Sequence, residues 1–480
     1  MSDDSSAQIA RHLHVLADAA NPGDKLPSTR ALAARFGAGP VTVQRALAVL
    51  VADGVVETRP GLGTFVRRRP VASACADVAW QTTALGPGRA DLAQVGTTLR
   101  DVAPGTIAMH SGYPDEELLP TKEVAAALAR AGRDPAARRR PPVAGLPELR
   151  RWFADELSGA GSGTGSEGAD VAQPWHESDV VIASGGQAAL AASFRALASP
   201  GESIVMESPT YWGAIGAARS AGLVIVPVSR VDGAPDPVEL DAAFRVSGAR
   251  VFYAQPSYAN PTGDRWSAIA RREILDVVEE RRAFLIADDW AHDFGIDEPV
   301  RPMAVADVNG HVVYIRSLTK SLSSAVRVAA VAARGPVRRR IEQALTHSDL
   351  FVSPVLQTAA LEVITRPVWQ RHRRALARTL GERRDALLTA LGEHGFEVRR
   401  PGGGLHLWVP LDGFGPVSDA GLVVARALAA GLSISPGSEW FPAEETAAFA
   451  RLTYTAASPA RYGEAAAILA EAVAASGRGR

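Results

Sequence analysis

The chain has 480 residues, 47% of them hydrophobic and 21% charged, and a formal net charge of −1, which predicts a globular protein of more than one domain. The single cysteine, Cys75, excludes an intrachain disulfide and a cysteine-rich zinc site, so we expect no metal and a reducing, cytoplasmic location. The sequence has neither a signal peptide nor a run of roughly 20 apolar residues, which argues against a membrane span.

The N-terminal part of the chain has the pattern of three helices and a hairpin. Residues 1–70 are mildly basic, with nine Lys or Arg against six Asp or Glu. Ile9, Leu13 and Leu16 predict the inner face of a first helix, and a second helix follows between a Ser28 cap and Gly37. A third helix begins at Pro40 and has an apolar stripe of Val43, Leu47, Leu50 and Val51. Residues 55–58 and 64–66 predict two strands joined by a turn.

This order of elements predicts a winged helix-turn-helix. The third helix would lie in the major groove of DNA, and the hairpin would contact the backbone as a wing. The polar side chains placed to meet phosphates or base edges are Arg30, Arg35, Thr42, Gln44, Arg45 and Arg59. The alternative is a small helical domain for protein contacts, with solvated arginines.

Three segments of this head, residues 26–33, 41–43 and 59–66, resemble the GntR family of bacterial regulators. The resemblance covers nearly all of residues 7–66 and implies binding to double-stranded operator DNA. The residues that it implies as DNA contacts are Arg30, Thr42, Gln44, Arg45, Arg59, Gly61 and Gly63. Pro40 and Gln44 stand where many relatives carry arginine, which bears on affinity and operator sequence more than on DNA binding itself.

A linker and a larger domain follow the head. Residues 70–103 have no clear periodicity and predict a linker between domains at residues 1–69 and 104–480. In the larger domain, helical stretches separate apolar runs at residues 203–206, 251–254, 284–287 and 312–315. Such runs are typical of strands buried on both faces of a mostly parallel sheet, in which ligands bind at the carboxyl ends of the strands. A Gly/Ser run from Ser158 predicts a surface insertion within this domain.

Lys320 is distinctive because lysine occurs only at positions 25, 122 and 320. It comes just after a predicted strand, near the hydroxyls of Ser317 and Thr319, and Arg327 lies seven residues beyond it. A lysine can lose its proton and form a Schiff base, which arginine cannot do in proteins. The two hydroxyls and the guanidinium could hold a phosphate. The alternative is a lone surface lysine in a polar loop.

Other polar groups also follow predicted strands. Gly185, Gly186 and Gln187 come after a short strand and open a helix, where backbone N–H groups can face an anion. Asn260 follows the strand at 251–254, and Asp288 follows the strand at 284–287. A carboxylate at a buried strand end would keep a pyridine nitrogen protonated. The alternative for Asp288 is a helix cap or a surface acid.

This ordered set, together with residues 110–120 and 403–406, resembles the class I/II aminotransferases of fold type I from about residue 104 to near the C-terminus. With its GntR-like head, the whole chain resembles the MocR subfamily of regulators. The resemblance implies an α/β domain with a mostly parallel central sheet, a smaller C-terminal α+β subdomain, and pyridoxal 5'-phosphate as cofactor. It also implies a homodimer.

The resemblance assigns a role to each site residue. Lys320 would form a Schiff base with the cofactor, Asp288 would pair with the pyridine nitrogen, and Asn260 would bond the ring hydroxyl. Tyr211 would stack on the ring, with its alternative a packed aromatic, and Arg451 would hold the carboxylate of an amino-acid-like effector. The residues that would surround the phosphate are Gly185, Gly186, Gln187, Ser317, Thr319 and Arg327.

Several positions depart from the family pattern. Trp290 stands where relatives usually carry a tyrosine that bonds the cofactor hydroxyl, and indole has a different reach. Gly213 replaces an arginine found in some MocR ligand sites. Arg140 and Pro141 lie where a tyrosine of relatives reaches the phosphate of the neighbouring subunit.

The sequence therefore predicts a transcription regulator whose cofactor-binding body senses an amino-acid-like effector and re-spaces the DNA-binding heads of a dimer. One alternative is a working class I/II aminotransferase. Another is a DNA-binding protein whose body has lost the cofactor and serves only for dimer contacts.

Overall fold

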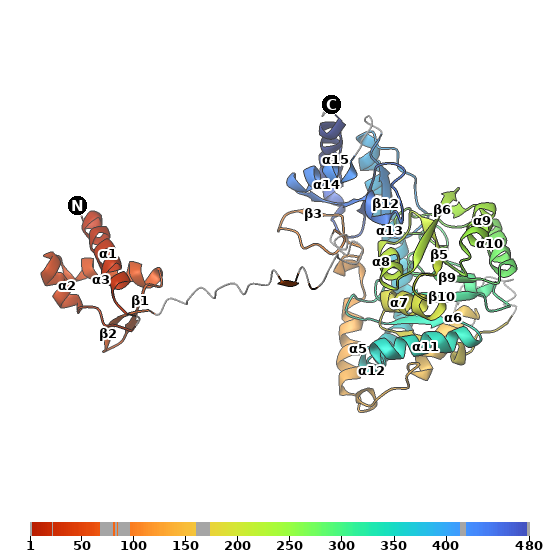
Figure 1. Ribbon diagram of the computed structural model, residues 1–480, viewed down its shortest axis with the longest axis horizontal. Helices are drawn as coiled ribbons and strands as arrows, with labels where there is room; N and C mark the ends of the chain where they lie inside the picture. Colours follow the sequence, from red (N-terminus) through yellow and green to blue (C-terminus); the bar gives the residue numbers. More distant parts are fainter. Residues whose placement is uncertain are drawn as a thin grey trace. The chain divides into compact units, whose positions relative to one another are not determined.

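The computed structural model describes residues 2–21, 23–67, 80–81, 84, 97–159, 173–412 and 419–477 (Figure 1). The chain divides into two compact units, Met1–Gly88 and Arg89–Arg480, which we call the head and the body. Most of the predicted linker at 70–103, with Cys75, and the Gly/Ser segment at 160–172 lie outside the described residues. No helix in the described part of the chain is long and apolar enough to cross a membrane.

The head consists of the three helices and the hairpin that the sequence predicts. The elements are α1 (Ser2–Ala19), α2 (Thr29–Phe36), α3 (Pro40–Ala52) and the antiparallel strands β1 (Val56–Arg59) and β2 (Gly63–Val66). Ser28 caps α2 by accepting from the Ala31 amide at 3.3 Å, and Gly37 ends it in the left-handed conformation with φ 57°. The core includes Leu13, Leu32, Val43 and Leu50, all fully buried.

One predicted core position in the head is wrong. Val51, assigned to the apolar stripe of the third helix, is 42% exposed, whereas Ala46 is fully buried. Val51 lies in the last turn of α3, where Val49 is exposed as well, whereas the buried stripe runs through Val43, Ala46, Leu47 and Leu50.

The first described residues of the body pack against its C-terminal part. The Thr97 hydroxyl donates to Glu439 at 2.5 Å, and the His110 ring Nε2 donates to the Arg100 carbonyl at 2.9 Å. Thr97 and Arg100, which fall within the predicted linker, are therefore hydrogen-bonded to residues of the body.

The body is built on an eight-stranded sheet with the order β4-β11-β10-β9-β8-β5-β6-β7. The strands are β4 (Val180–Ala183), β5 (Ser203–Ser208), β6 (Val224–Val231), β7 (Ala234–Pro235), β8 (Val251–Ala254), β9 (Phe284–Asp288), β10 (Val312–Ser317) and β11 (Ala329–Ala332). Strands β10, β9, β8, β5 and β6 pair in parallel in that order, while β11 and β7 run antiparallel to their neighbours. Each of the four predicted apolar runs forms a strand of this sheet.

Helices cover both faces of the sheet (Figure 1). Alternate strand residues belong to different cores, because Val205 packs with one set of helices while Ile204 and Met206 pack with another. The first set is α5 (Thr121–Arg133), α6 (Pro147–Leu157), α9 (Pro237–Ser247), α10 (Ala268–Glu280) and α12 (Pro354–Ile364). The second set is α7 (Gly186–Leu197), α8 (Trp212–Ser220) and α11 (Pro336–Asp349). This is the layered α/β arrangement that the sequence predicts.

A smaller α+β part completes the body around its own core. Its strands are β12 (His406–Pro410), β14 (Ser435–Pro436) and β15 (Phe449–Thr453) in one sheet, and β13 (Leu432–Ser433) with β3 (Ile107–Ala108) in another. Its helices are α13 (Pro367–Glu393), α14 (Ala420–Ala429) and α15 (Tyr462–Gly477). Short 3-10 turns lie at Glu116–Leu118, Ala136–Arg138, Glu177–Asp179, Met303–Val305, Gly437–Trp440 and Pro459–Arg461. The predicted C-terminal subdomain is therefore present.

Candidate functional site

Polar side chains collect at one edge of the large sheet. Ser317 ends β10, Asp288 ends the adjacent parallel strand β9, and Lys320 lies three residues after Ser317. Since carboxyl ends of parallel strands meet at the same edge, the fold brings these groups together although they are far apart in sequence. The turn from β4 into α7 adds Gly185 to the same edge.

The turn at Gly185 forms a cradle with the residues after β10. Gly185 has φ 89°, and a Cβ at this position would lie 2.8 Å from Arg327 Nη2 and 3.2 Å from Thr319 Oγ1. A Cβ on Gly186 would lie 3.5 Å from the Ser317 Cβ, and the Ser317 hydroxyl donates to Thr319 Oγ1 at 3.1 Å. The amides at the start of α7, two hydroxyls and a guanidinium thus face one small space. This combination suits an anion such as a phosphate.

Arg327 is available to such an anion. Its guanidinium has no acidic partner within the described residues, whereas Arg230, Arg316 and Arg338 each pair with an acidic side chain. Of the six predicted phosphate residues, Gly185, Gly186, Ser317, Thr319 and Arg327 therefore lie together, while the Gln187 side chain bonds the Gly213 carbonyl.

Lys320 is half-buried beside this cradle. Its Nζ lies 4.2 Å from the ring centroid of Trp290. Burial lowers the pKa of the amine to about 7, the charge of Arg451 acts in the same direction, and Asp288 opposes them. A substantial fraction of the amine is therefore neutral and nucleophilic near neutral pH.

Asp288 is buried and held in a fixed orientation. Its Oδ2 accepts from the Tyr253 hydroxyl at 2.9 Å and from Gln255 Nε2 at 2.8 Å. Burial raises its pKa to about 6, while the two hydrogen bonds and Lys320 oppose that shift. The neighbouring Asp289 is different, because it is engaged by the Tyr314 hydroxyl at 2.5 Å and by the His292 ring at 2.8 Å. Of the two adjacent aspartates, Asp288 is the one oriented beside Lys320.

Tyr211 and Gln187 share the space that Gly213 leaves open. Gln187 Nε2 donates to the Gly213 carbonyl at 2.7 Å. A Cβ on Gly213 would lie 2.5 Å from the Tyr211 hydroxyl oxygen and 2.6 Å from Gln187 Oε1. The departure at Gly213 therefore has a structural reason, because a side chain there would displace both neighbours. Burial raises the pKa of Tyr211, so this phenol stays neutral.

Arg451 lies in β15 with its side chain fully buried. Its Nη1 donates to Asn260 Oδ1 at 3.2 Å, its Nη2 donates to the His110 carbonyl, and its guanidinium lies 4.7 Å from the Trp440 ring centroid. It has no ion-pair partner within the described residues, and its Nε has no hydrogen bond. Burial lowers its pKa to about 9. A buried guanidinium in this state favours an incoming carboxylate.

Part of this site was not predicted from the sequence. His406 stacks on Trp290 with centroids 5.7 Å apart and an interplanar angle of 21°, and its Nε2 lies 3.4 Å from Arg451 Nη1. Burial and the charges of Arg451 and Lys320 hold the pKa of His406 well below its ordinary value, so this ring is neutral. His406 was noted only as part of a family segment, and Trp440, Gln255 and Tyr253 had no signal in the sequence.

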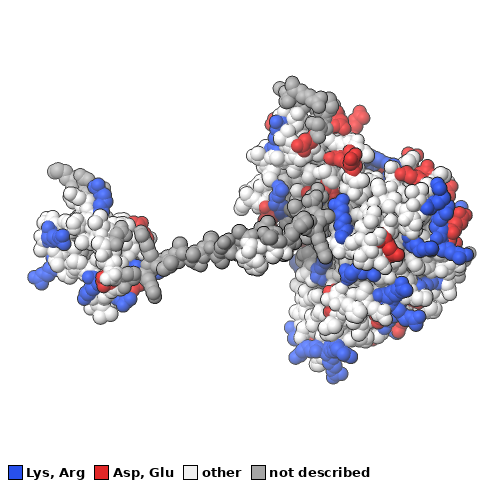
Figure 2. All heavy atoms as spheres, viewed as in Figure 1, with Lys and Arg blue, Asp and Glu red and all other residues white. Residues whose placement is uncertain are grey.

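Figure 2 shows Lys and Arg side chains on the surface of the head. Arg30 on α2 and Gln44 and Arg45 at the start of α3 are exposed, and Thr42 is half-buried. Gly61 and Gly63 have φ 75° and 124°, and a Cβ on Gly63 would lie 2.6 Å from Lys25 Cε, so the wing turn requires glycine there.

Arg59, the remaining predicted contact in the wing, is engaged within the free head. Its Nε donates to Glu57 at 2.8 Å, and its guanidinium lies 4.8 Å from the Phe65 ring centroid. An exposed pair of this kind contributes about 0–1 kcal/mol, so a DNA phosphate can compete with Glu57 for the guanidinium.

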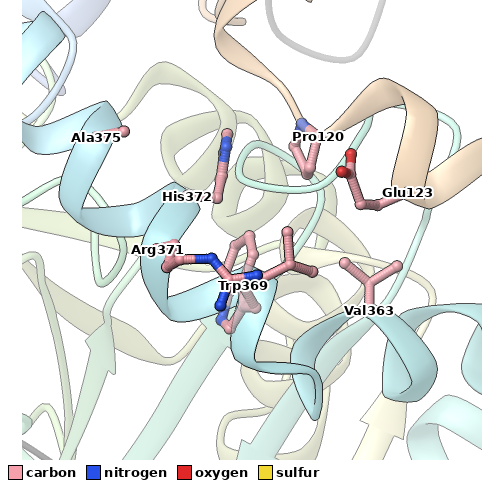
Figure 3. A pocket seen from close by; sticks show the side chains of 8 residues that line it. Pro120, Glu123, Val363, Trp369, Arg371, His372 and Ala375 are labelled. Carbon is pink, nitrogen blue, oxygen red and sulfur yellow. The ribbon is translucent and has the colours of Figure 1, made fainter.

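A separate hollow of about 270 Å³ lies where α5 begins and α13 follows α12 (Figure 3). Among its lining residues are Pro120, Glu123, Val363, Trp369 and His372. None of the predicted site residues lines it, so we do not assign it to the constellation around Lys320.

Comparison with family models divides the chain in the same way. Residues 107–467 match "Aminotransferase class I and II", and residues 7–66 match "Bacterial regulatory proteins, gntR family". The first match spans most of the body and the second spans the head.

Relatives with known names include regulators and enzymes. The chain is 29% identical to the uncharacterized HTH-type transcriptional regulator YdfD of Bacillus subtilis (strain 168), across 91% of this chain and 89% of that one. It is 28% identical to the probable rhizopine catabolism regulatory protein MocR of Rhizobium meliloti, across 79% and 75% of the two chains. Among solved structures, LysN, the α-aminoadipate aminotransferase of Thermus thermophilus, complexed with N-(5'-phosphopyridoxyl)-L-leucine, superposes with a TM-score of 0.69 at 25% identity. That match covers 79% of this chain and 96% of LysN.

Proposed function

Since the chain belongs to the aminotransferase class I and II family and carries a GntR-family domain, we propose that it is a DNA-binding transcription regulator of the MocR type whose body binds pyridoxal 5'-phosphate through Lys320. The observation that carries the cofactor proposal is the anion cradle at Gly185 and Arg327, next to a lysine whose pKa is about 7. A phosphate site beside a nucleophilic amine matches the two groups of this cofactor that the protein would bind, its phosphate and its aldehyde.

The polar groups at this site fit pyridoxal phosphate. The cradle offers amides, hydroxyls and a guanidinium for a phosphate, and Asp288 offers an oriented carboxylate for a protonated ring nitrogen. Asn260 accepts from Arg451 through Oδ1, and its amide N–H₂, which has no partner among the described residues, can donate to a ring oxygen. When bound, pyridoxal phosphate supplies an aldehyde that links to an amine and a ring that withdraws electrons from that link. Tyr211, over Gly213, would cover one face of the ring.

The effector would be an amino-acid-like molecule whose carboxylate binds Arg451. This assignment rests on a buried guanidinium that makes no ion pair in the described part of the body, although the charge of Glu439 acts on it. Asn260 and the His110 carbonyl fix the guanidinium plane, so a carboxylate would meet an oriented donor set rather than a mobile side chain. Binding can regulate DNA affinity only if the ligand prefers one conformation of the protein over another. We further propose that the regulator acts as a homodimer on double-stranded operator DNA.

The test of attachment uses the scarcity of lysine. Purified protein with added pyridoxal phosphate should develop an absorbance band that borohydride converts into a stable adduct on the peptide containing Lys320. Lys320→Ala should lose both, while the exposed Lys122→Ala, a matched control, should retain them. An adduct that persists in Lys320→Ala, or that maps to Lys25 or Lys122, contradicts the assignment.

The test of regulation is binding to the intergenic DNA upstream of the gene. Wild type should bind this duplex, and amino acids that change the absorbance band should change the affinity. Arg451→Gln should bind DNA but lose that response. Equal DNA affinity with and without every responsive amino acid would contradict the sensing role.

An active aminotransferase is the second candidate, because Lys320, Asp288 and Arg451 are all present at one site. Sustained turnover of an amino acid and a keto acid, together with no binding to upstream DNA, would favour the enzyme over the regulator.

A further inference from the structure

We propose that Trp290 is a positioning residue for the Lys320 amine, with the face of its indole holding the protonated form of that amine. Nζ lies 4.2 Å from the indole centroid, inside the range of a cation–π contact. Within the described residues Nζ makes no ion pair and no hydrogen bond, so the indole is its only direct polar contact. Trp290 stands where relatives usually carry a tyrosine, and the role proposed here uses the ring face rather than a hydroxyl.

The indole is held rigidly enough to act as a platform. Trp290 is buried, stacks on His406 with centroids 5.7 Å apart, and packs against Phe294 at 6.1 Å. Its Nε1 has no hydrogen-bond partner among the described residues, so packing rather than a polar anchor fixes the ring. A Cβ on Gly404 would lie 3.9 Å from Trp290 Cη2, which places backbone against the ring edge.

The charged groups around Lys320 act in opposite directions. Asp288 on β9 favours the protonated amine, whereas Arg451 on β15 and the loss of water favour the neutral amine. His406 on β12 is neutral and lies between Trp290 and Arg451, so it adds no compensating charge. The indole face therefore joins Asp288 as a group that stabilises the charged form.

The indole face also affects the reactivity of the Lys320 amine. Because the protonated amine is held on the indole, Trp290 limits the fraction of Lys320 that is nucleophilic at a given pH. Removing the ring face should lower the titration midpoint of Lys320 by about half to one and a half pH units, the range expected of a partly desolvated cation–π contact. A merely structural role for Trp290 would not move this midpoint downward.

The experiment measures the three lysines separately in cofactor-free protein. Trace acetic anhydride labels each amine in proportion to its neutral fraction, and mass spectrometry of the peptides gives a titration curve for Lys25, Lys122 and Lys320. Trp290→Leu removes the aromatic face, and Trp290→Phe keeps a smaller one. We expect the Lys320 midpoint to fall in Trp290→Leu and to fall less in Trp290→Phe, with Lys25 and Lys122 unchanged.

An unchanged Lys320 midpoint in Trp290→Leu overturns the proposal. Loss of folding would shift the Lys320 midpoint in the opposite direction, because in an unfolded chain the midpoint rises toward 10.5, the ordinary value for lysine. If Trp290→Leu unfolds, Trp290→Phe decides, since a midpoint equal to that of wild type also overturns the proposal. The readout needs no cofactor, so its failure is distinguishable from failure of the covalent attachment proposed above.

Discussion

Replacing Lys320 by methionine should change the pH dependence of stability in a direction that follows from the burial of its amine. Burial lowers the pKa of this amine from 10.5 to about 7. Between these values the unfolded chain binds a proton that the folded protein does not. Wild type therefore gains stability as pH rises through this window, and the gain is absent from Lys320→Met, whose side chain has similar length and no charge.

The size of the effect follows from the same two values. For a folded pKa of about 7 and an unfolded value of 10.5, proton linkage gives wild type about 2 to 3 kcal/mol more stability at pH 9 than at pH 6 from this residue. This is an upper value, because Lys320 is only half-buried and water screens part of the cost. The variant should therefore exceed wild type in stability most clearly at pH 6.

The assay is urea unfolding of the cofactor-free protein at pH 6 and pH 9, followed by the tryptophan fluorescence of the body. Lys122→Met, at an exposed position on α5, is the control for a lysine that folding does not bury. The quantity to compare is the difference in unfolding free energy between Lys320→Met and wild type at each pH. A difference that is the same at both pH values, or that grows toward pH 9, refutes the reasoning about Lys320.

Two further expectations concern the cradle and the head. Gly185→Ala should weaken pyridoxal phosphate binding at least about tenfold in a spectroscopic titration, because its Cβ would lie 2.8 Å from Arg327 Nη2 at φ 89°; Gly216→Ala, in open space on α8, should leave it unchanged. Arg45→Gln should weaken binding to upstream DNA in fluorescence anisotropy and reduce the slope of log affinity against log salt by about 1, whereas Arg11→Gln on α1 should alter neither.

The strands and the place of Lys320 just after a strand were predictable because their signals are local. The run Phe284–Ala287 is apolar throughout, as a strand buried on both faces requires, and it forms β9. Lys320 was identifiable because a chain with three lysines places one just after a strand. The α2 caps at Ser28 and Gly37 likewise depend only on neighbouring residues.

The interactions that were not predictable depend on neighbours that sequence spacing does not specify. Trp290 and His406 stack although more than a hundred residues separate them, and no periodicity relates their positions. That a side chain at position 213 would clash with Tyr211 is known only from the structure, where the Tyr211 ring lies against Gly213. A separation of two residues in the sequence does not determine the direction in which that ring points. The engagement of Arg59 by Glu57 depends on the side-chain directions in β1, where alternate residues share a face.

The charges at the sheet edge link the two ligands proposed for the body. Arg451 lowers the pKa of Lys320, so a carboxylate that pairs with Arg451 would cancel part of that effect and return a proton to the amine on the Trp290 face. By reciprocity, any group that keeps Lys320 neutral would weaken the carboxylate at Arg451 to the same extent. Binding of a carboxylate at the proposed effector site and protonation of Lys320 are then coupled. Proton uptake must therefore accompany carboxylate binding near pH 7. Calorimetry of propionate binding in two buffers of different ionisation enthalpy measures that uptake, and identical heats in both buffers would show that Arg451 and Lys320 are not coupled.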